Sequence, residues 1–172
     1  MSNDYYLYRR KIKSGDLLAW DSGSGSIFNT ITLFIIKVVT LSPYVHVGVA
    51  WKTAGRLFVI EAGLDGVKIS PLSKKKNFYH IAMDVKWTTA HDCFLLNKVG
   101  ESYSVSDAIR GALGLLESHY DHKWQCAELA TAFYSYLGMD LGDSYTPAKL
   151  VDVLLTMGKT LVKVTRVDKP RS

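Results

Sequence analysis

The sequence is poor in cysteine and lacks a long hydrophobic run. Its 172 residues include two cysteines, Cys93 and Cys126. Two cysteines cannot build the disulfide framework of a small secreted domain, so we expect no oxidative stapling. The most apolar stretch, residues 27–39, is too short to span a bilayer and contains Asn29 and Lys37. We therefore expect a packed helix there and no transmembrane helix.

The N-terminal segment lacks the apolar core of a secretory signal. Residues 1–16 are polar and aromatic, which predicts a cytoplasmic protein unless a phage or a secretion system delivers it. The formal net charge of +5 favours anionic partners in general. However, the basic residues are scattered, and their one run, Lys74 to Lys76, is typical of a solvated loop. The sequence therefore predicts no nucleic-acid partner and leaves contact of residues 27–39 with a membrane surface as an alternative.

The chain has no internal repeat and no low-complexity segment. Its length favours a single domain, residues 1–172, with a sizeable core. Short alternating segments come first and segments of helical period come later, which predicts an α+β domain with an antiparallel sheet packed against helices. The predicted strands are 15–20, 45–51, 56–62, 66–70, 78–85 and 160–167, and the predicted helices are 27–39, 89–100, 104–118, 124–137 and 147–158.

A cysteine stands at the start of the amphipathic helix 124–137. Cys126 shares its apolar stripe with Leu129 and Phe133, but it lies in the first turn. There the helix dipole and the N–H groups without intrahelical acceptors stabilise an anion, so a thiolate forms easily. The alternative is a core cysteine that only fills space. A second cysteine, Cys93, lies among apolar residues and is predicted to be a core thiol.

His46 and Glu61 are polar residues in otherwise apolar strands. An imidazole in a buried strand needs a hydrogen-bonding partner, and the small Gly48 and Ala50 on its face leave room for a helix N-terminus. Glu61 ends the neighbouring strand, within reach of His46 across an antiparallel pair. A carboxylate beside an imidazole fixes its tautomer and raises its basicity, as an orienting residue does. The alternatives are a satisfied core histidine, an exposed glutamate, and Asp65 as the orienting residue.

Six segments, in order, resemble the permuted papain-like cysteine hydrolases of the YiiX kind, which are relatives of NlpC-type cell-wall peptidases. They lie between residues 14 and 150 and read GDLLAW, PYVHVGVAW, FVIEAG-x2-GV, G-x2-Y, W-Q-C-A-E-L and TP-x2-L. The resemblance implies a circularly permuted papain-like (NlpC-type) fold, in which the cysteine helix follows the histidine strand. It also implies Cys126 as nucleophile, His46 as base and Glu61 as the third polar residue.

The same resemblance implies an oxyanion hole. The backbone N–H of Cys126 is the first donor, and Tyr103 or Gln125 is the candidate for the second donor or for substrate binding. Ala127 stands where the family usually has serine, and Glu128 matches a recurring glutamate with a structural role.

The implied activity is that of a cysteine peptidase or amidase that needs no cofactor. It would cleave an amide or isopeptide bond, with a peptidoglycan stem peptide as the first substrate to consider. One alternative is a lipid acyl hydrolase or acyltransferase, and another is a catalytically inactive module that binds a peptide or a lipid. A zinc site is a third alternative, because His119, His122 and Cys126 form H-x2-H-x3-C, although that reading leaves His46 unexplained.

Overall fold

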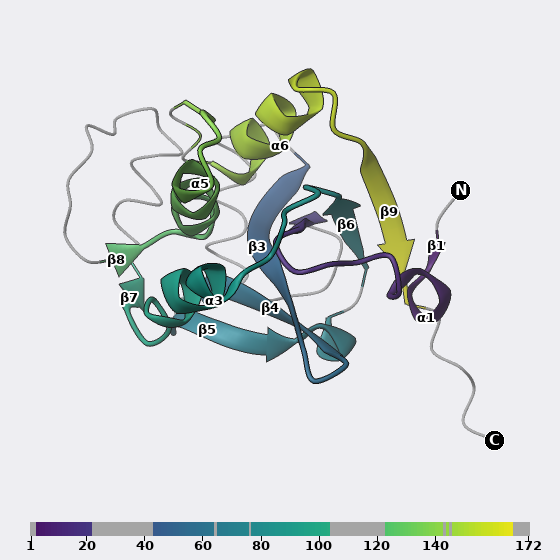
Figure 1. Ribbon diagram of the computed structural model, residues 1–172. Helices are drawn as coiled ribbons and strands as arrows, with labels where there is room; N and C mark the ends of the chain where they lie inside the picture. Colours follow the sequence, from purple (N-terminus) through teal and green to yellow (C-terminus); the bar gives the residue numbers. More distant parts are fainter. Residues whose placement is uncertain are drawn as a thin grey trace.

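A seven-stranded β-sheet forms the centre of the protein (Figure 1). The computed structural model describes residues 3–21, 43–63, 65–75, 77–103, 123–142, 144 and 146–166. The strand order is β1-β9-β6-β2-β3-β4-β5, and β7 and β8 form a separate parallel pair. β1 is parallel to β9, whereas the strands from β9 to β5 are antiparallel neighbours. The strands are β1 (Asn3–Asp4), β2 (Leu17–Asp21), β3 (Tyr44–Thr53), β4 (Arg56–Gly63), β5 (Gly66–Pro71), β6 (Phe78–Ile81), β7 (Ser102–Tyr103), β8 (Lys123–Trp124) and β9 (Leu161–Thr165).

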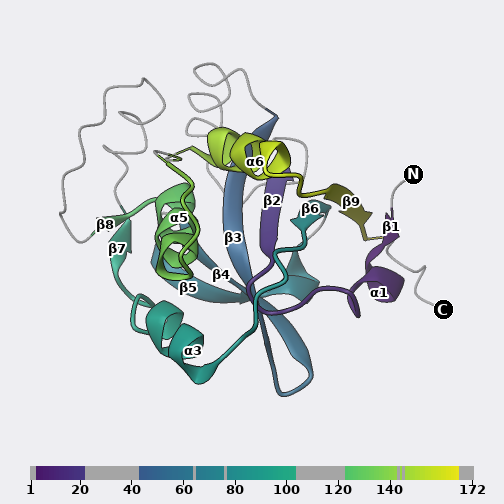
Figure 2. The ribbon, with the colours of Figure 1, turned by 45° about the horizontal axis from the view of Figure 1, so that its top comes forward.

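The helices come mainly from the second half of the chain. Figure 2 shows α5 and α6 in front of the sheet, and both pack against β3. Among the described residues, no helix is both long enough and apolar enough to cross a membrane. The helices are α1 (Tyr5–Tyr8), the 3-10 helix η1 (Leu72–Lys74), α3 (Thr89–Leu96), α5 (Cys126–Tyr136) and α6 (Pro147–Thr156).

This arrangement confirms the predicted α+β class. The six longer strands and the helices α3, α5 and α6 fall where the sequence pattern placed them, with shifted ends. The last helix is capped, since the Thr146 hydroxyl accepts from the Lys149 N–H at 3.2 Å. The helices predicted at 27–39 and 104–118 lie outside the described residues.

Two predicted boundaries are wrong, each for a local reason. The strand predicted over 78–85 ends at Ile81, and the following segment contains Asp84 at a positive φ of 55°, which a strand does not accommodate. The helix predicted over 89–100 begins at Thr89 as expected, and the Thr88 N–H caps it by donating to His91 Nδ1 at 3.0 Å. It ends at Leu96, because the following N–H groups of Lys98 and Val99 donate to the carbonyls three residues earlier, each at 3.1 Å, and form turns instead of α-helix.

The sheet is buried on both faces. Val47, Val49 and Ile60 belong to a core that includes Leu129 and Phe133 of α5. On the opposite face, a second core joins Leu18, Trp20, Ala50 and Val59 of the sheet to Ile12, Leu72 and Phe78. Apolar burial on both faces accounts for the near-continuous hydrophobic character of β2 and β3.

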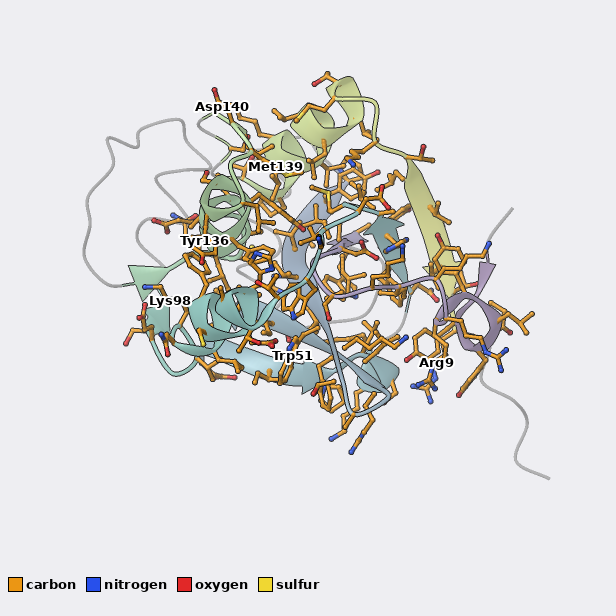
Figure 3. The ribbon with its side chains drawn as sticks, in the orientation of Figure 1. Arg9, Trp51, Lys98, Tyr136, Met139 and Asp140 are labelled. Carbon is orange, nitrogen blue, oxygen red and sulfur yellow. The ribbon has the colours of Figure 1, made fainter. Side chains whose placement is uncertain are left out.

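The first turn of α3 binds two indoles, one of which comes from the sheet. Trp51 of β3 and Trp87 each donate an N–H to Asp92 Oδ1, at 2.7 Å and 3.0 Å. Figure 3 shows Trp51 beside this helix. One carboxylate at the helix start therefore holds α3 against the edge of the core.

The strands β3 and β4 separate at one end. Their ladder runs from Thr53–Arg56 to Val49–Ile60 and stops there. Beyond that point β3 stays paired with β2, where the register shifts next to Trp20, and β4 continues with β5. Figures 1 and 2 both show α5 over the region where the strands diverge. This separation lies beside His46 and Glu61.

Candidate active site

The helix α5 begins at Cys126. Its first helical hydrogen bond runs from the Leu129 N–H to the Gln125 carbonyl at 2.9 Å, so the Cys126 N–H precedes the intrahelical pattern. The Gln125 N–H donates to Glu128 Oε2 at 3.3 Å. Glu128 therefore caps the helix, and the cap places the thiol in the first turn, where the helix dipole favours an anion. The Cys126 side chain is 6% exposed.

His46 and Glu61 form a buried pair across the separated strands. His46 Nε2 lies 2.8 Å from Glu61 Oε2, and the two residues are 1% and 0% exposed. An ionised carboxylate only accepts hydrogen bonds, so Nε2 carries the proton and donates it. Glu61 therefore fixes the orientation of the ring, and Nδ1 is the nitrogen that can exchange a proton with another group.

The thiol of Cys126 interacts with the imidazole of His46. Burial disfavours the imidazolium, but the charge and hydrogen bond of Cys126, together with the hydrogen bond and charge of Glu61, outweigh it. The result is a pKa of His46 raised to about 9. At neutral pH the ring is therefore an imidazolium placed between a sulfur and a carboxylate.

Glu61 accepts three hydrogen bonds from different elements. Besides His46, it receives the Ser70 hydroxyl at 2.7 Å and the Lys75 ammonium at 2.6 Å, both on Oε1. Burial alone would raise the pKa of this carboxyl, but the hydrogen bonds and charges of His46 and Lys75 lower the pKa of Glu61 to about 2. The carboxylate is therefore ionised although it is completely buried.

An indole covers the imidazole. Trp20 is the ladder partner of His46, and the two ring centroids are 5.4 Å apart. The Lys75 ammonium lies 5.6 Å from the centroid of the same indole. Because Trp20 is 3% exposed, it shields both cations from water, which strengthens the charge interactions in the cluster.

The structure brings three of the predicted site residues together: Cys126, His46 and Glu61. Gln125 is beside them as the N-cap of α5, and it is buried. Tyr103 belongs to β7 and pairs with Trp124 of β8, but its side chain lies outside the described residues.

The structure excludes Asp65 as the orienting residue, whereas two histidines of the alternative zinc site are not described. Asp65 is not the orienting residue, because its side chain is 81% exposed and bonds Lys68 at 2.9 Å. His119 and His122 of the zinc alternative lie outside the described residues. Within the part of the chain that is described, no three His, Cys, Asp or Glu side chains gather as a metal site would require.

The space above Gly48 is filled differently from the expectation. A Cβ atom at this glycine would lie 2.5 Å from Val59 Cγ2 and 3.2 Å from Glu61 Cβ. The neighbouring strand β4, rather than a helix N-terminus, therefore fills the space that the glycine leaves. The body of α5 packs on the opposite, valine-lined face, and Cys126 reaches the imidazole at the helix end.

Other expectations about single residues were wrong. Cys93 is exposed rather than a core thiol. His80, which the sequence did not single out, lies 2.8 Å from Asp16 Oδ2 and 3.1 Å from the Tyr8 hydroxyl. Lys75 bonds Glu61, whereas its run of lysines is typical of a solvated loop. The missed signal was Glu61 itself, since a buried carboxylate requires cationic or hydrogen-bonding partners.

The comparisons with known proteins concern the fold. No protein-family model matches the chain, and no curated protein matches it. The structure is similar to the crystal structure of the metalloprotein YiiX from Escherichia coli O157:H7, assigned to DUF1105. The TM-score is 0.55 at 20% sequence identity, and the match covers 90% of this chain and 88% of that chain. The chain therefore has a fold of the YiiX kind.

Proposed function

We propose that this protein is a thiol hydrolase that uses Cys126 as nucleophile, His46 as acid–base and Glu61 as orienting residue. The observation that carries the proposal is the buried imidazole, held by Glu61 at 2.8 Å and close enough to Cys126 for the thiol to raise the pKa of His46. A nucleophile, a base and an orienting group in this order are the requirements of covalent acyl transfer. The fold of the YiiX kind supports a permuted papain-like arrangement.

The first chemical step is the attack of sulfur. With His46 as an imidazolium, the Cys126 proton already lies on His46 Nδ1, and Sγ adds to the carbonyl carbon of the substrate as a thiolate. The negative charge that develops on the carbonyl oxygen is stabilised at the N-terminus of α5, where the Cys126 N–H is the first donor. Gln125 and Tyr103 stay the candidates for the second donor.

The second step breaks the scissile bond and restores the enzyme. His46 gives its proton to the leaving amine, and the carbon–nitrogen bond breaks, which leaves a thioester on Cys126. Water then loses a proton to His46 and attacks the thioester, so the acid is released and the thiol is restored. Glu61 holds the ring in one orientation through both steps.

The substrate belongs to the amides. We propose an amide or isopeptide bond, with a peptidoglycan stem peptide as the first candidate. The alternatives from the sequence, a lipid ester and ligand binding without turnover, are separate outcomes of the same assay.

Purified muropeptides and phosphatidylglycerol vesicles, each incubated with the protein and analysed by mass spectrometry, test the proposal. We expect a new amine and a new carboxylic acid from the muropeptides, no turnover by Cys126→Ala, and full turnover by Cys93→Ala, whose thiol is exposed on α3. Equal turnover by the wild type and Cys126→Ala would contradict the nucleophile. Release of fatty acid from the vesicles would instead identify a lipid acyl hydrolase.

The metal alternative is tested in the same assay. The YiiX neighbour is a metalloprotein, whereas the thiol mechanism proposed for this chain requires no metal. We therefore expect activity to persist in EDTA and to fall when Zn²⁺ occupies the thiolate. Loss of activity in EDTA with recovery on addition of Zn²⁺ would contradict the thiol mechanism.

A further inference from the structure

Lys75 is directed into the protein by a tight turn. β5 ends at Pro71, the 3-10 helix η1 follows, and the Lys75 N–H donates to the Leu72 carbonyl at 3.0 Å. Leu72 is fully buried and anchors this turn in the second core. The Lys75 side chain is 11% exposed, whereas the neighbouring Lys74 is exposed. Two consecutive lysines therefore have different environments.

The two oxygens of Glu61 have separate partners. Oε1 accepts from Lys75 at 2.6 Å and from Ser70 at 2.7 Å, and Oε2 lies 2.8 Å from His46 Nε2. Two donors on one oxygen fix the rotation of the carboxylate plane, because turning the group would break both charge-assisted and neutral hydrogen bonds. The orientation of the oxygen that meets His46 thus depends on donors outside the proposed triad.

Cys126, His46, Glu61 and Lys75 form a buried row in which the charges alternate. In the ion-pair state the sulfur of Cys126 is negative, His46 positive, Glu61 negative and Lys75 positive, so the four groups sum to zero. A neutral row lowers the cost of burying each ion, whereas a row of three would leave one charge uncompensated. Trp20 covers the imidazolium and the ammonium from one side.

One other cation lies near Glu61 in the sheet. Lys68 is the ladder partner of Glu61 on β5, but its ammonium bonds Asp65 at 2.9 Å. Lys68 is therefore a matched control for Lys75, since it is close to the same glutamate without an ion pair to it among the described contacts.

We infer, on the basis of the proposed function, that Lys75 is a positioning residue, which locks the Glu61 carboxylate so that Oε2 stays on His46 Nε2. Lys75 acts through Glu61 and does not touch the substrate. The inference extends the proposed triad to a fourth residue, taken from the loop between β5 and β6.

The test measures the rate at which iodoacetamide alkylates Cys126 between pH 5 and pH 9, with peptide mass spectrometry to separate Cys126 from Cys93. We expect Lys75→Met to lower the alkylation rate at pH 6 about tenfold. A shift of about one pH unit in the titration of the Cys126–His46 pair would have this effect. We expect Lys75→Arg to restore most of the rate, and Lys74→Met and Lys68→Met to match the wild type. Circular dichroism confirms that each variant is folded.

The Glu61→Gln background separates positioning from a general structural effect. If Lys75 acts through the carboxylate, adding Lys75→Met to Glu61→Gln changes the alkylation rate no further. A further tenfold loss in that background would overturn the inference, as would a Lys75→Met rate equal to that of Lys74→Met. A faster rate in Lys75→Met would also overturn it, because the ammonium would then act only as an opposing charge.

A second readout keeps this test independent of the proposed function. The pH titration of the His46 ring, followed by NMR, should have its midpoint about one pH unit lower in Lys75→Met and unchanged in Lys74→Met. If wild-type Cys126 is not alkylated faster than Cys93, the hydrolase proposal fails while the His46 midpoint still decides the role of Lys75. An unchanged or raised midpoint in Lys75→Met overturns the inference.

Discussion

Replacing Glu61 with glutamine removes the charge on which the buried row depends. The amide has nearly the shape of the carboxylate, but it presents one oxygen where Glu61 presents two. Lys75, Ser70 and His46 then compete for that oxygen, and the amide N–H₂ group faces donors rather than acceptors. We expect a stability loss that depends on pH in a defined way.

The magnitude follows from the pKa of Glu61. Folding lowers it from 4.5 to about 2, which corresponds to about 3 kcal/mol of stability. A group with a lowered pKa contributes fully above its unfolded value, so the contribution is complete above pH 4.5 and is lost as the pH falls through 2. About 2 kcal/mol of it disappears between pH 6 and pH 3. Breaking a buried ion pair by removing one partner has a cost of this size, about 3–5 kcal/mol.

His46 determines how the stability contributed by the same ion pair changes at alkaline pH. Its pKa is raised from 6.5 to about 9, so its contribution is complete below pH 6.5 and is lost as the pH rises through 9. The two pKa changes describe one ion pair and are counted once. Because Cys126 also raises the pKa of His46, the Glu61→Gln protein should keep part of this alkaline decline.

Urea unfolding, followed by circular dichroism at pH 3, 6 and 9, is the assay. We expect Glu61→Gln to be about 3 kcal/mol less stable than the wild type at pH 6, and the difference to shrink by about 2 kcal/mol at pH 3. Asp65→Asn is the control, because Asp65 is 81% exposed and its surface pair contributes about 1 kcal/mol or less. A difference that is equal at pH 3 and pH 6 would refute the assignment of a buried, ionised Glu61.

Three further predictions concern other parts of the structure. Gly48→Ala places a Cβ 2.5 Å from Val59 Cγ2, so we expect the free energy of unfolding, measured by urea titration, to fall by about 1–3 kcal/mol. Gly63→Ala is the control and should be nearly neutral, because the nearest atom to its Cβ is Lys68 Cε at 3.7 Å. Equal losses in the two variants would contradict the close packing at Gly48. Asp16→Asn removes the carboxylate that bonds His80 at 2.8 Å and the Met83 N–H at 3.0 Å. We expect the melting temperature to fall, because these buried hydrogen bonds become weaker, and the alkylation rate of Cys126 to stay unchanged. An unchanged melting temperature would refute a role for this network in stability. Thr146→Ala removes the hydroxyl that caps the Lys149 N–H, so the free energy of unfolding should fall by about 1 kcal/mol in the same urea titration. Thr156→Ala removes an exposed hydroxyl and should lower it less. The reverse order would contradict a stabilising role for this cap.

The sequence predicted those elements whose pattern is local. Alternation fixed β3, β4 and β5 to within a few residues, and proline after threonine marked the start of α6. Caps were less predictable, because threonine occupies both position 88 and position 89, and the choice between them depends on His91. The short strands β1, β7 and β8 have two residues each and carry no periodic signal.

The candidate site was predictable only in part. Cys126, His46 and Glu61 stand out because each is a polar or reactive group in an apolar segment. Lys75 does not, because one lysine in a run of three is turned inward by the anchoring of Leu72, which is a tertiary effect. The side of Gly48 that is filled depends on Val59 across the ladder, and the alternation pattern of one strand cannot reveal that.

The most direct measurement of the central claim compares the two thiols of the chain at pH 6, in the wild type and in His46→Ala. Cys93 is exposed and Cys126 is 6% exposed, so access alone predicts faster alkylation of Cys93. An activated sulfur beside His46 predicts the opposite order in the wild type, and a return to slow alkylation of Cys126 in His46→Ala. Alkylation of Cys126 that is slower than that of Cys93 in the wild type, and unaffected by His46→Ala, would contradict the account.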